Sequence, residues 1–261
     1  MAEKFAIVTG ASTGIGLELA RCCANDGYDL LLAADESAIE GAASQLRQEN
    51  GAGDIRAVNV DLATTEGVDK LLAAVKGRAV DVLIANAGRG LGDAFLNQDF
   101  EKVRGVIDTN VLGTTYILHQ IVREMRNCNE GRVLITGSIA GFVPGSFQAV
   151  YNASKAYLNS LSFALREELR DTEVTVTCLM PGATETEFFR RAEMLDTKVG
   201  TDKKDDAAMV AQAGYRAMLK GESDVVTGMK NKIQSAVANV VPNEVLAKQH
   251  RKMSEPGSAE K

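Results

Sequence analysis

The segment Thr9-Gly10-Ala11-Ser12-Thr13-Gly14-Ile15-Gly16 follows the strand-like run Phe5–Thr9 and leads directly into a helical pattern. Glycines permit a tight turn, let backbone N–H groups approach a pyrophosphate, and allow a helix to pack closely on a strand. The helix that follows presents unpaired N–H groups and a partial positive charge at its N-terminus. A glycine turn between a first strand and a first helix predicts a dinucleotide-binding loop. Its contacts would come from Gly10, Ser12, Thr13, Gly14, Ile15 and Gly16.

Short β-rich runs alternate with helical patterns along the rest of the chain. We expect strands at Phe5–Thr9, Asp29–Ala34, Ile55–Val60, Val80–Ala85, Arg132–Thr136, Val174–Leu179 and Ser223–Thr227. We expect helices at Ile15–Asp26, Ser37–Asn50, Thr65–Lys76, Phe100–Met125, Val150–Leu169 and Asp205–Leu219. The apolar runs in these strands fit burial on both faces better than a regular alternation of polar and apolar residues. The pattern predicts an α/β fold of the doubly wound, Rossmann-like kind, with helices on both faces of a parallel sheet. We expect about seven strands, in the order 3-2-1-4-5-6-7.

No linker or repeat divides the chain, so residues 1–253 are predicted to form one domain. Residues 181–204 break the regular alternation, and we expect a mobile substrate loop there, because such long loops are usually functional lids or disordered. Residues 254–261 are polar and contain Pro256 and Gly257, which predicts a flexible tail.

Composition argues against several classes of function. The formal net charge of −6 is not that of a nucleic-acid binder, which usually carries a clustered basic excess. The apolar runs are too short to span a bilayer, and the N-terminus shows no secretory segment, so we expect a cytoplasmic protein. The four cysteines form no C-x-x-C pair and have no histidines nearby, so we expect no metal site.

Three residues in the second half of the chain have the chemistry of a proton-transfer site. Tyr151 and Lys155 are four positions apart in the predicted helix Val150–Leu169, so they share a face. A nearby ammonium lowers the pKa of a phenol, ordinarily about 10, because it favours the phenolate. Ser138, just after the fifth predicted strand, could hold a substrate oxygen. In isolation, a surface Tyr–Lys contact or a strand-ending serine would give the same pattern.

Together with the Gly-x-x-x-Gly-x-Gly spacing, these residues resemble the short-chain dehydrogenase/reductase superfamily, in its single-domain branch, over roughly residues 4–227. The resemblance implies an NAD(P)-dependent oxidoreductase that interconverts a secondary alcohol and a ketone, with Tyr151 as general acid/base. It implies four catalytic residues: Asn110, Ser138, Tyr151 and Lys155. It also implies cofactor contacts from Tyr151 and Lys155 themselves and from Asp61, Leu62, Asn86, Ala87, Gly88, Pro181, Gly182, Thr184 and Thr186.

The end of the second strand bears on which nicotinamide is bound. A carboxylate there can accept a hydrogen bond from a ribose 2′-hydroxyl, whereas an arginine suits a 2′-phosphate. Asp35 and Glu36 follow this strand, so a 2′-phosphate would meet repulsion and no cation. We therefore favour NAD over NADP as cofactor. Alternatively, both acids only begin the next helix, where negative charge is favourable.

The sequence says less about the substrate and the oligomeric state than about the cofactor. Phe142, Val143, Phe147, Phe188 and Phe189 could line a substrate pocket or could belong to the core. The resemblance implies a homodimer or homotetramer formed by the two long helices, whose apolar positions include Val111, Leu112, Ile117, Leu158 and Leu161. Two other functions stay open: an NADPH-dependent 3-oxoacyl thioester reductase, and a non-catalytic dinucleotide-sensing protein.

Overall fold

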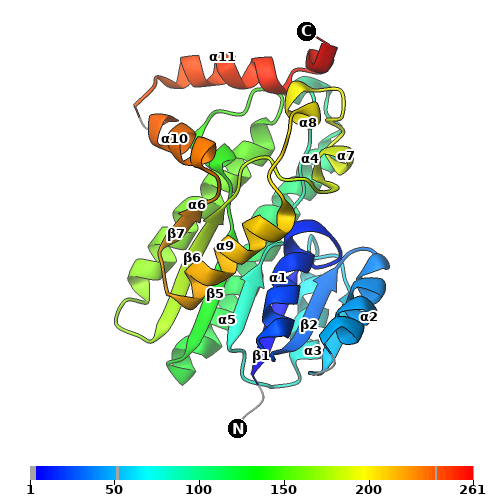
Figure 1. The fold of residues 1–261 in the computed structure, drawn as a ribbon, viewed down its shortest axis with the longest axis vertical. Coiled ribbons are helices and arrows are strands. Elements are labelled where there is room, and N and C mark those ends of the chain that lie inside the picture. Colours follow the sequence, from blue (N-terminus) through cyan, green and yellow to red (C-terminus); the bar gives the residue numbers. More distant parts are fainter. Residues whose placement is uncertain (1–3, 51–52, 239, 261) are drawn as a thin grey trace.

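The centre of the molecule is a seven-stranded parallel sheet, in a computed structural model that describes residues 4–50, 53–238 and 240–260 (Figure 1). The strands follow the order β3-β2-β1-β4-β5-β6-β7, which confirms the predicted fold class and order. Their bounds are β1 Phe5–Thr9, β2 Asp29–Ala34, β3 Ile55–Asn59, β4 Val82–Ala85, β5 Gly131–Thr136, β6 Val174–Met180 and β7 Asp224–Val226.

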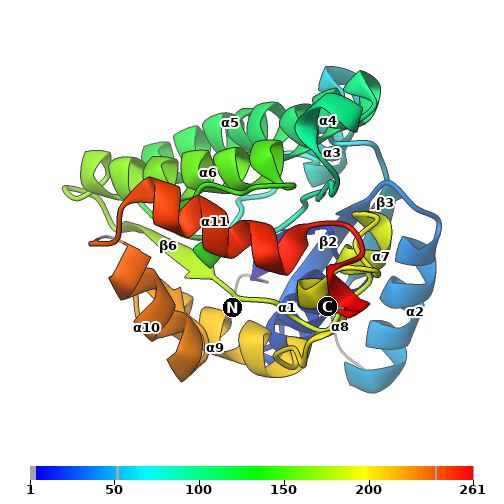
Figure 2. The same cartoon turned by 90° about the horizontal axis from the view of Figure 1, so that it is seen from above.

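Helices cover both faces of this sheet (Figure 2). One layer holds α1 (Gly14–Asn25), α2 (Ala38–Asn50) and α9 (Ala207–Leu219), and the other holds α3 (Thr65–Val75), α4 (Phe100–Ile107), α5 (Thr114–Cys128) and α6 (Ala149–Glu168). Alternate residues of each inner strand point to opposite layers: Val8 packs in one core, and Ile7 in the other. Because both directions are buried, the inner strands β1, β2 and β4 are mostly apolar.

The strand order reverses between β1 and β4, which extend the sheet in opposite directions from its middle. The loops that leave the carboxyl ends of these neighbouring strands diverge and leave a crevice, where open α/β sheets bind their ligands. The fold therefore places the glycine turn after β1, the segment after β4 and the end of β5 at one edge.

The predicted helix Phe100–Met125 is not continuous. Its path runs through α4, a π-helical segment η2 (Asp108–Gly113) and then α5. Close approach to another segment accompanies the break, since a Cβ added at Gly113 would lie 1.9 Å from the carbonyl oxygen of Leu62. Such π segments are frequent at functional sites, and this one carries Asn110.

Several elements without a sequence prediction lie over the carboxyl edge of the sheet (Figure 1). Residues 181–204 contain two short helices, α7 (Phe188–Arg191) and α8 (Lys198–Thr201), and β7 is followed by α10 (Met229–Ala238) and α11 (Asn243–Ser254). Three 3-10 turns complete the described elements: η1 (Phe95–Asn97), η3 (Ile139–Phe142) and η4 (Ser258–Glu260).

The end of the chain contacts residues 196–198, and the flexible tail expected at residues 254–261 stays a prediction. The backbone N–H of Lys198 donates to Ser258 Oγ at 2.9 Å, and that of Gly257 donates to Asp196 Oδ2 at 2.9 Å. Ser254 and Ser258 are buried. Backbone N–H groups, the Ser258 hydroxyl and the Asp196 carboxylate make these contacts, so a polar composition gives no sign of them.

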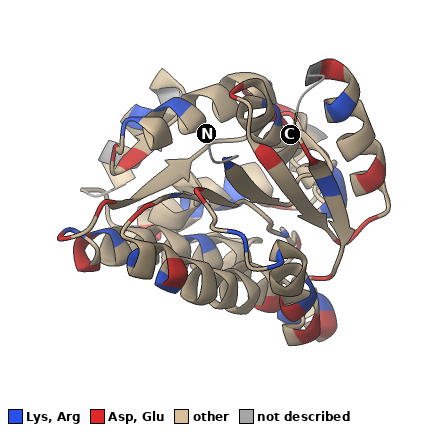
Figure 3. Cartoon of the chain, turned by 90° about the horizontal axis from the view of Figure 1, so that it is seen from below, with Lys and Arg blue, Asp and Glu red and all other residues tan. Residues whose placement is uncertain are grey.

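Charged side chains of both signs are interspersed along the outer helices and loops (Figure 3). Within the described ranges, no helix combines the length and apolar character needed to cross a membrane. The same residues contain no group of three or more His, Cys, Asp or Glu side chains that could hold a metal ion.

Candidate functional site

A cavity of about 1680 Å³ opens at the carboxyl edge of the sheet. Every predicted site residue except Asn110 lines it: Gly10, Ser12, Thr13, Gly14, Ile15, Gly16, Asp35, Asp61, Leu62, Asn86, Ala87, Gly88, Ser138, Tyr151, Lys155, Pro181, Gly182, Thr184 and Thr186. The fold thus brings together segments from six strand ends. Their roles in binding and catalysis stay predictions, for which the cavity gives the geometry.

The glycine turn is shaped so that side chains cannot fill it. Gly10 and Gly14 have φ angles of +65° and +58°, a region that favours glycine. A Cβ added at Gly16 would lie 2.1 Å from the Gly10 carbonyl oxygen. Thr13, at the N-cap of α1, makes no side-chain cap hydrogen bond, so the first N–H groups of this helix lack that partner. The turn fits the pyrophosphate of a dinucleotide, which would supply the acceptors.

Asn86 joins the glycine turn to the neighbouring strands. Its Nδ2 donates to the carbonyl oxygens of Thr9 at 3.2 Å and Gly10 at 3.3 Å, and its Oδ1 accepts from Thr136 Oγ1 at 3.1 Å. The backbone N–H groups of Asn86 and Ala87 both donate to Thr9 Oγ1 at 3.0 Å. These bonds hold β1, β4 and β5 together at the crevice.

The three predicted proton-transfer residues meet inside the cavity. Ser138, at the N-cap of η3, donates to the Pro181 carbonyl oxygen at 3.3 Å and accepts from the backbone N–H of Ala140 at 3.0 Å. Lys155, on α6 with Tyr151, is buried and donates from Nζ to the Thr136 carbonyl oxygen at 2.8 Å. The Lys155 ammonium lies over the Tyr151 ring, 5.9 Å from its centroid.

Burial decides the protonation of this pair, contrary to the expected lowering of the phenol pKa. Burial raises the pKa of Tyr151 to about 12, and the hydroxyl of Ser138 offsets part of that rise. Burial also lowers the pKa of Lys155 to about 8. Desolvation favours the neutral form of both groups, and it is the largest cause of both shifts.

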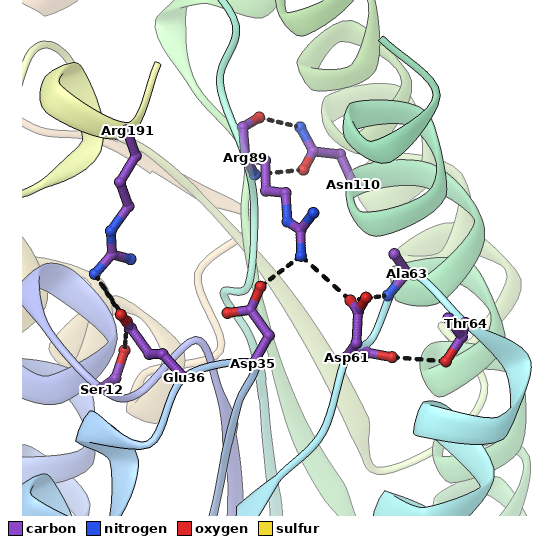
Figure 4. A network of polar contacts seen from close by, with 9 residues as sticks. All are labelled: Ser12, Asp35, Glu36, Asp61, Ala63, Thr64, Arg89, Asn110 and Arg191. Carbon is purple, nitrogen blue, oxygen red and sulfur yellow. Dashed lines mark hydrogen bonds and ion pairs between the residues drawn. The ribbon is translucent and has the colours of Figure 1, made fainter. Parts of the chain in front are cut away.

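Asn110 lies behind the cavity wall and is fully buried. Its Oδ1 accepts from the backbone N–H of Arg89 at 2.8 Å, and its Nδ2 donates to the Arg89 carbonyl oxygen at 2.9 Å (Figure 4). The same Nδ2 donates to Ser154 Oγ at 2.9 Å. The π-helical turn of η2 therefore clamps the segment after β4 to α6. A part for Asn110 in a proton relay stays a prediction.

The acids after β2 are paired with two arginines that sequence reasoning missed (Figure 4). Arg89 contacts Asp35 at 2.5 Å and Asp61 at 3.3 Å, and Arg191 contacts Glu36 at 2.8 Å. The expectation that a 2′-phosphate would meet no cation is therefore wrong. The sequence contained one signal for Arg89, because this residue directly follows the Asn86-Ala87-Gly88 segment. It contained none for Arg191, which is 155 positions from Glu36.

The substrate side of the cavity is partly apolar. Of the aromatic and aliphatic candidates, Val143, Phe188 and Phe189 line it, while Phe142 and Phe147 do not. The Phe188 ring lies 5.0 Å from that of Tyr151, centroid to centroid. Helix α11 adds six residues that sequence reasoning missed: Leu246, Gln249, His250, Lys252, Met253 and Ser254. Burial lowers the pKa of His250, whose Nδ1 lies 2.8 Å from the Ser146 carbonyl oxygen.

Comparisons with known proteins agree with this geometry. Residues 4–195 match the sequence profile of the short chain dehydrogenase family. An uncharacterized oxidoreductase of Staphylococcus saprophyticus is 33% identical over 219 residues, covering 83% of this chain and 91% of that protein. Among solved structures, a short-chain dehydrogenase from Sphingobium yanoikuyae in complex with NADPH has a TM-score of 0.80 at 24% identity, covering 92% and 96% of the two chains. A short chain dehydrogenase/reductase from Burkholderia phymatum in complex with NAD has a TM-score of 0.80 at 25% identity, covering 90% and 92%.

Proposed function

As a member of the short-chain dehydrogenase/reductase family, this chain is an NAD(P)-dependent oxidoreductase, and we propose that it interconverts a secondary alcohol and a ketone. One observation supports this proposal above the others. Ser138, Tyr151 and Lys155 converge in the same cavity as the glycine turn. A bound nicotinamide would supply or accept hydride, and the chain would handle the proton.

Tyr151 is the proposed general acid/base. Its raised pKa keeps the phenol protonated at neutral pH, which suits donation of a proton to the oxygen of a ketone as hydride reaches the carbon. The hydroxyl of Ser138 would hold that oxygen. Lys155, still charged below a pH of about 8, would stabilise the phenolate left after proton transfer. Asn110 would act through the segment that it clamps.

We propose that NAD is preferred over NADP. Asp35 lies at the end of β2, where its carboxylate can accept a hydrogen bond from the ribose 2′-hydroxyl. Three carboxylates, from Asp35, Glu36 and Asp61, share this end of the cavity with the guanidinium groups of Arg89 and Arg191. The two solved structures carry one cofactor each, NADPH and NAD, so likeness alone favours neither.

The substrate is proposed to be a ketone or alcohol of moderate size with an apolar body. Val143, Phe188 and Phe189 line the cavity, with the Phe188 ring beside that of Tyr151, and Leu246 of α11 adds a further apolar surface. Burying such side chains against an apolar substrate would provide binding energy without requiring a fixed charge.

Assembly is proposed to use the layer that contains α5 and α6. Ile117 and Leu158, two of the apolar positions considered for an interface, are buried within the chain. Leu112 is 59% exposed, and Tyr157 and Phe163 are also exposed. These exposed side chains fit a homodimer or homotetramer contact better than a solvent-facing surface.

The matched test compares Tyr151→Phe with Tyr157→Phe, since both tyrosines belong to α6 and only Tyr151 lines the cavity. Turnover would be followed by NAD(P)H absorbance with ketones, alcohols and a 3-oxoacyl thioester, and dinucleotide binding by cofactor fluorescence. We expect Tyr151→Phe to lower kcat by about 10²–10⁴ while binding persists, and Tyr157→Phe to keep its activity. Full activity of Tyr151→Phe would refute the mechanism. Binding by the wild type without turnover of any substrate would favour the dinucleotide sensor.

A further inference from the structure

The backbone of Arg89 is fixed at the mouth of the cavity. The fully buried side chain of Asn110 bonds both the N–H and the carbonyl of Arg89, at 2.8 and 2.9 Å. The Arg89 side chain extends from this clamp toward the ends of β2 and β3 (Figure 4). The position of the Arg89 backbone therefore follows from the fold and does not depend on the ion pairs at the tip of its side chain.

The guanidinium of Arg89 lies between two carboxylates. It contacts Asp35 Oδ2 at 2.5 Å and Asp61 Oδ1 at 3.3 Å, and the three side chains are 41%, 44% and 48% exposed. Ion pairs between half-exposed groups contribute little to stability, because solvent screens them. The guanidinium can thus exchange a carboxylate partner for another anion at low cost.

A second cation reaches the same acids from the substrate loop. Arg191 of α7 contacts both carboxylate oxygens of Glu36, at 2.8 and 3.1 Å. Glu36 also accepts a hydrogen bond from Ser12 Oγ in the glycine turn, at 2.5 Å. Figure 4 shows Arg89 and Arg191 approaching the end of β2 from different segments, with Asp35 and Glu36 between them.

We propose that Arg89 and Arg191, which we call the arginine pair, set how strongly this protein discriminates against a ribose 2′-phosphate. The inference rests on the proposed function, because it concerns the cofactor of the same site. Without the pair, Asp35 and Glu36 would repel a phosphate, whereas guanidinium groups bind phosphate by charge-assisted hydrogen bonds. When a 2′-phosphate is present, the two guanidinium groups exchange their carboxylate partners for the phosphate. The protein therefore prefers NAD(H) and also binds NADP(H), and losing either guanidinium makes the discrimination stricter.

The test measures dissociation constants for NADH and NADPH by fluorescence titration. It uses the wild type, Arg89→Gln, Arg191→Gln, the double variant and the control Arg170→Gln, which removes an equally charged, exposed side chain paired with Glu167 outside the cavity. Competition by AMP and by adenosine 2′,5′-bisphosphate isolates the adenosine half of the cofactor. We expect the ratio of the NADPH constant to the NADH constant to rise about fivefold in each single variant, as for a half-exposed charged hydrogen bond. It should rise further in the double variant. Arg89→Lys, which keeps the charge, should stay nearer the wild type, and Arg170→Gln should not change the ratio.

Two results would overturn the inference alone: an unchanged or lower ratio in the double variant, or a wild type that binds NADH but shows no binding of NADPH. In both cases the wild type still binds a nicotinamide, so hydride transfer survives as the proposed function. If neither dinucleotide binds the wild type, the proposed function fails as well. Thermal unfolding of each variant confirms that the protein measured is folded.

Discussion

The Lys155 ammonium lies 5.9 Å from the ring centroid of Tyr151, the residue one helical turn earlier on α6. Burial acts on the two groups in opposite senses, raising the phenol pKa to about 12 and lowering the ammonium pKa to about 8. At neutral pH the pair is therefore a phenol beside an ammonium, which is the state that ketone reduction requires. The first charge to be lost as pH rises is that of Lys155.

This order of titration predicts the pH dependence of ketone reduction. We expect kcat/KM, which reports the free enzyme, to be level near pH 7 and to fall as pH rises through about 8, because neutral Lys155 no longer stabilises the phenolate. The measurement is a rate profile from pH 6 to 10. Lys155→Met should be slow at every pH and should lack this fall. A fall of the same shape in that variant would assign it to another group.

The same burial predicts a conflict between activity and stability. The pKa of Lys155 is about 8 in the folded protein and 10.5 as the ordinary value, so the cost of burying its charge is complete below pH 8 and disappears as pH rises toward 10.5. Lys155→Met should raise the free energy of unfolding by about 1–2 kcal/mol at pH 7, with the lost bond to Thr136 offsetting the rest.

Urea unfolding at pH 7 and pH 9.5 tests this, with the exposed Lys220→Met as control. The gain in the free energy of unfolding of Lys155→Met over the wild type should be smaller at pH 9.5 than at pH 7. A destabilised Lys155→Met at both pH values would show that the hydrogen bond to Thr136 outweighs the cost of burial.

Local sequence predicted the sheet and the glycine turn because their causes are local. A strand buried on both faces needs a continuous apolar run, and the turn needs glycines at Gly10 and Gly14, where φ is positive. The break at η2 coincides with a contact that is distant in sequence, since Gly113 approaches the Leu62 carbonyl. The helical pattern through residues 100–125 is unbroken, so the local sequence does not indicate that contact.

The missed part of the site has the same explanation. The arginine pair meets its carboxylates across 54 and 155 positions of sequence, so only the folded chain brings the charges together. Helix α11 buries Leu246 and Ser254 and little else. Its composition is mostly polar, and periodicity therefore gave no helix there, although six of its residues line the cavity.

The glycine turn gives a stability prediction with an internal control. In Gly16→Ala, the new methyl would meet the Gly10 carbonyl at 2.1 Å, so we expect the free energy of unfolding to fall by about 1–3 kcal/mol through overpacking and dinucleotide binding to be lost. Gly41→Ala, in α2 with open space where the new Cβ would lie, should stabilise by about 0.4–1 kcal/mol. Thermal and urea unfolding of the two variants measure the contrast, and equal effects would contradict the close packing of this turn.

Phe188 should limit substrate size. Its ring stands 5.0 Å from that of Tyr151 and fills the space over Gly90, where an added Cβ would lie 2.4 Å from Phe188 Cζ. Phe188→Ala should raise the ratio of kcat/KM for bulky over small ketones by about tenfold or more, as expected when an apolar pocket is enlarged. Phe95→Ala removes an exposed ring outside the cavity and should leave the ratio unchanged. An unchanged ratio in Phe188→Ala would place the substrate elsewhere.

The exposed side chains of the α5 and α6 layer predict how assembly can be broken. Leu112 is exposed beside α5, whereas its neighbours Ile117 and Leu158 belong to the core of the chain. In an oligomer, Leu112→Glu would bury an unpaired carboxylate, so its dissociation constant should rise by about 10²-fold or more, while the fold of the subunit persists. Sedimentation velocity over a concentration series measures this change. Leu195→Glu, an equally exposed substitution between α7 and α8, should not alter assembly. A wild type that sediments as a monomer at every concentration, or a Leu112→Glu variant that assembles normally, would remove this layer as the interface.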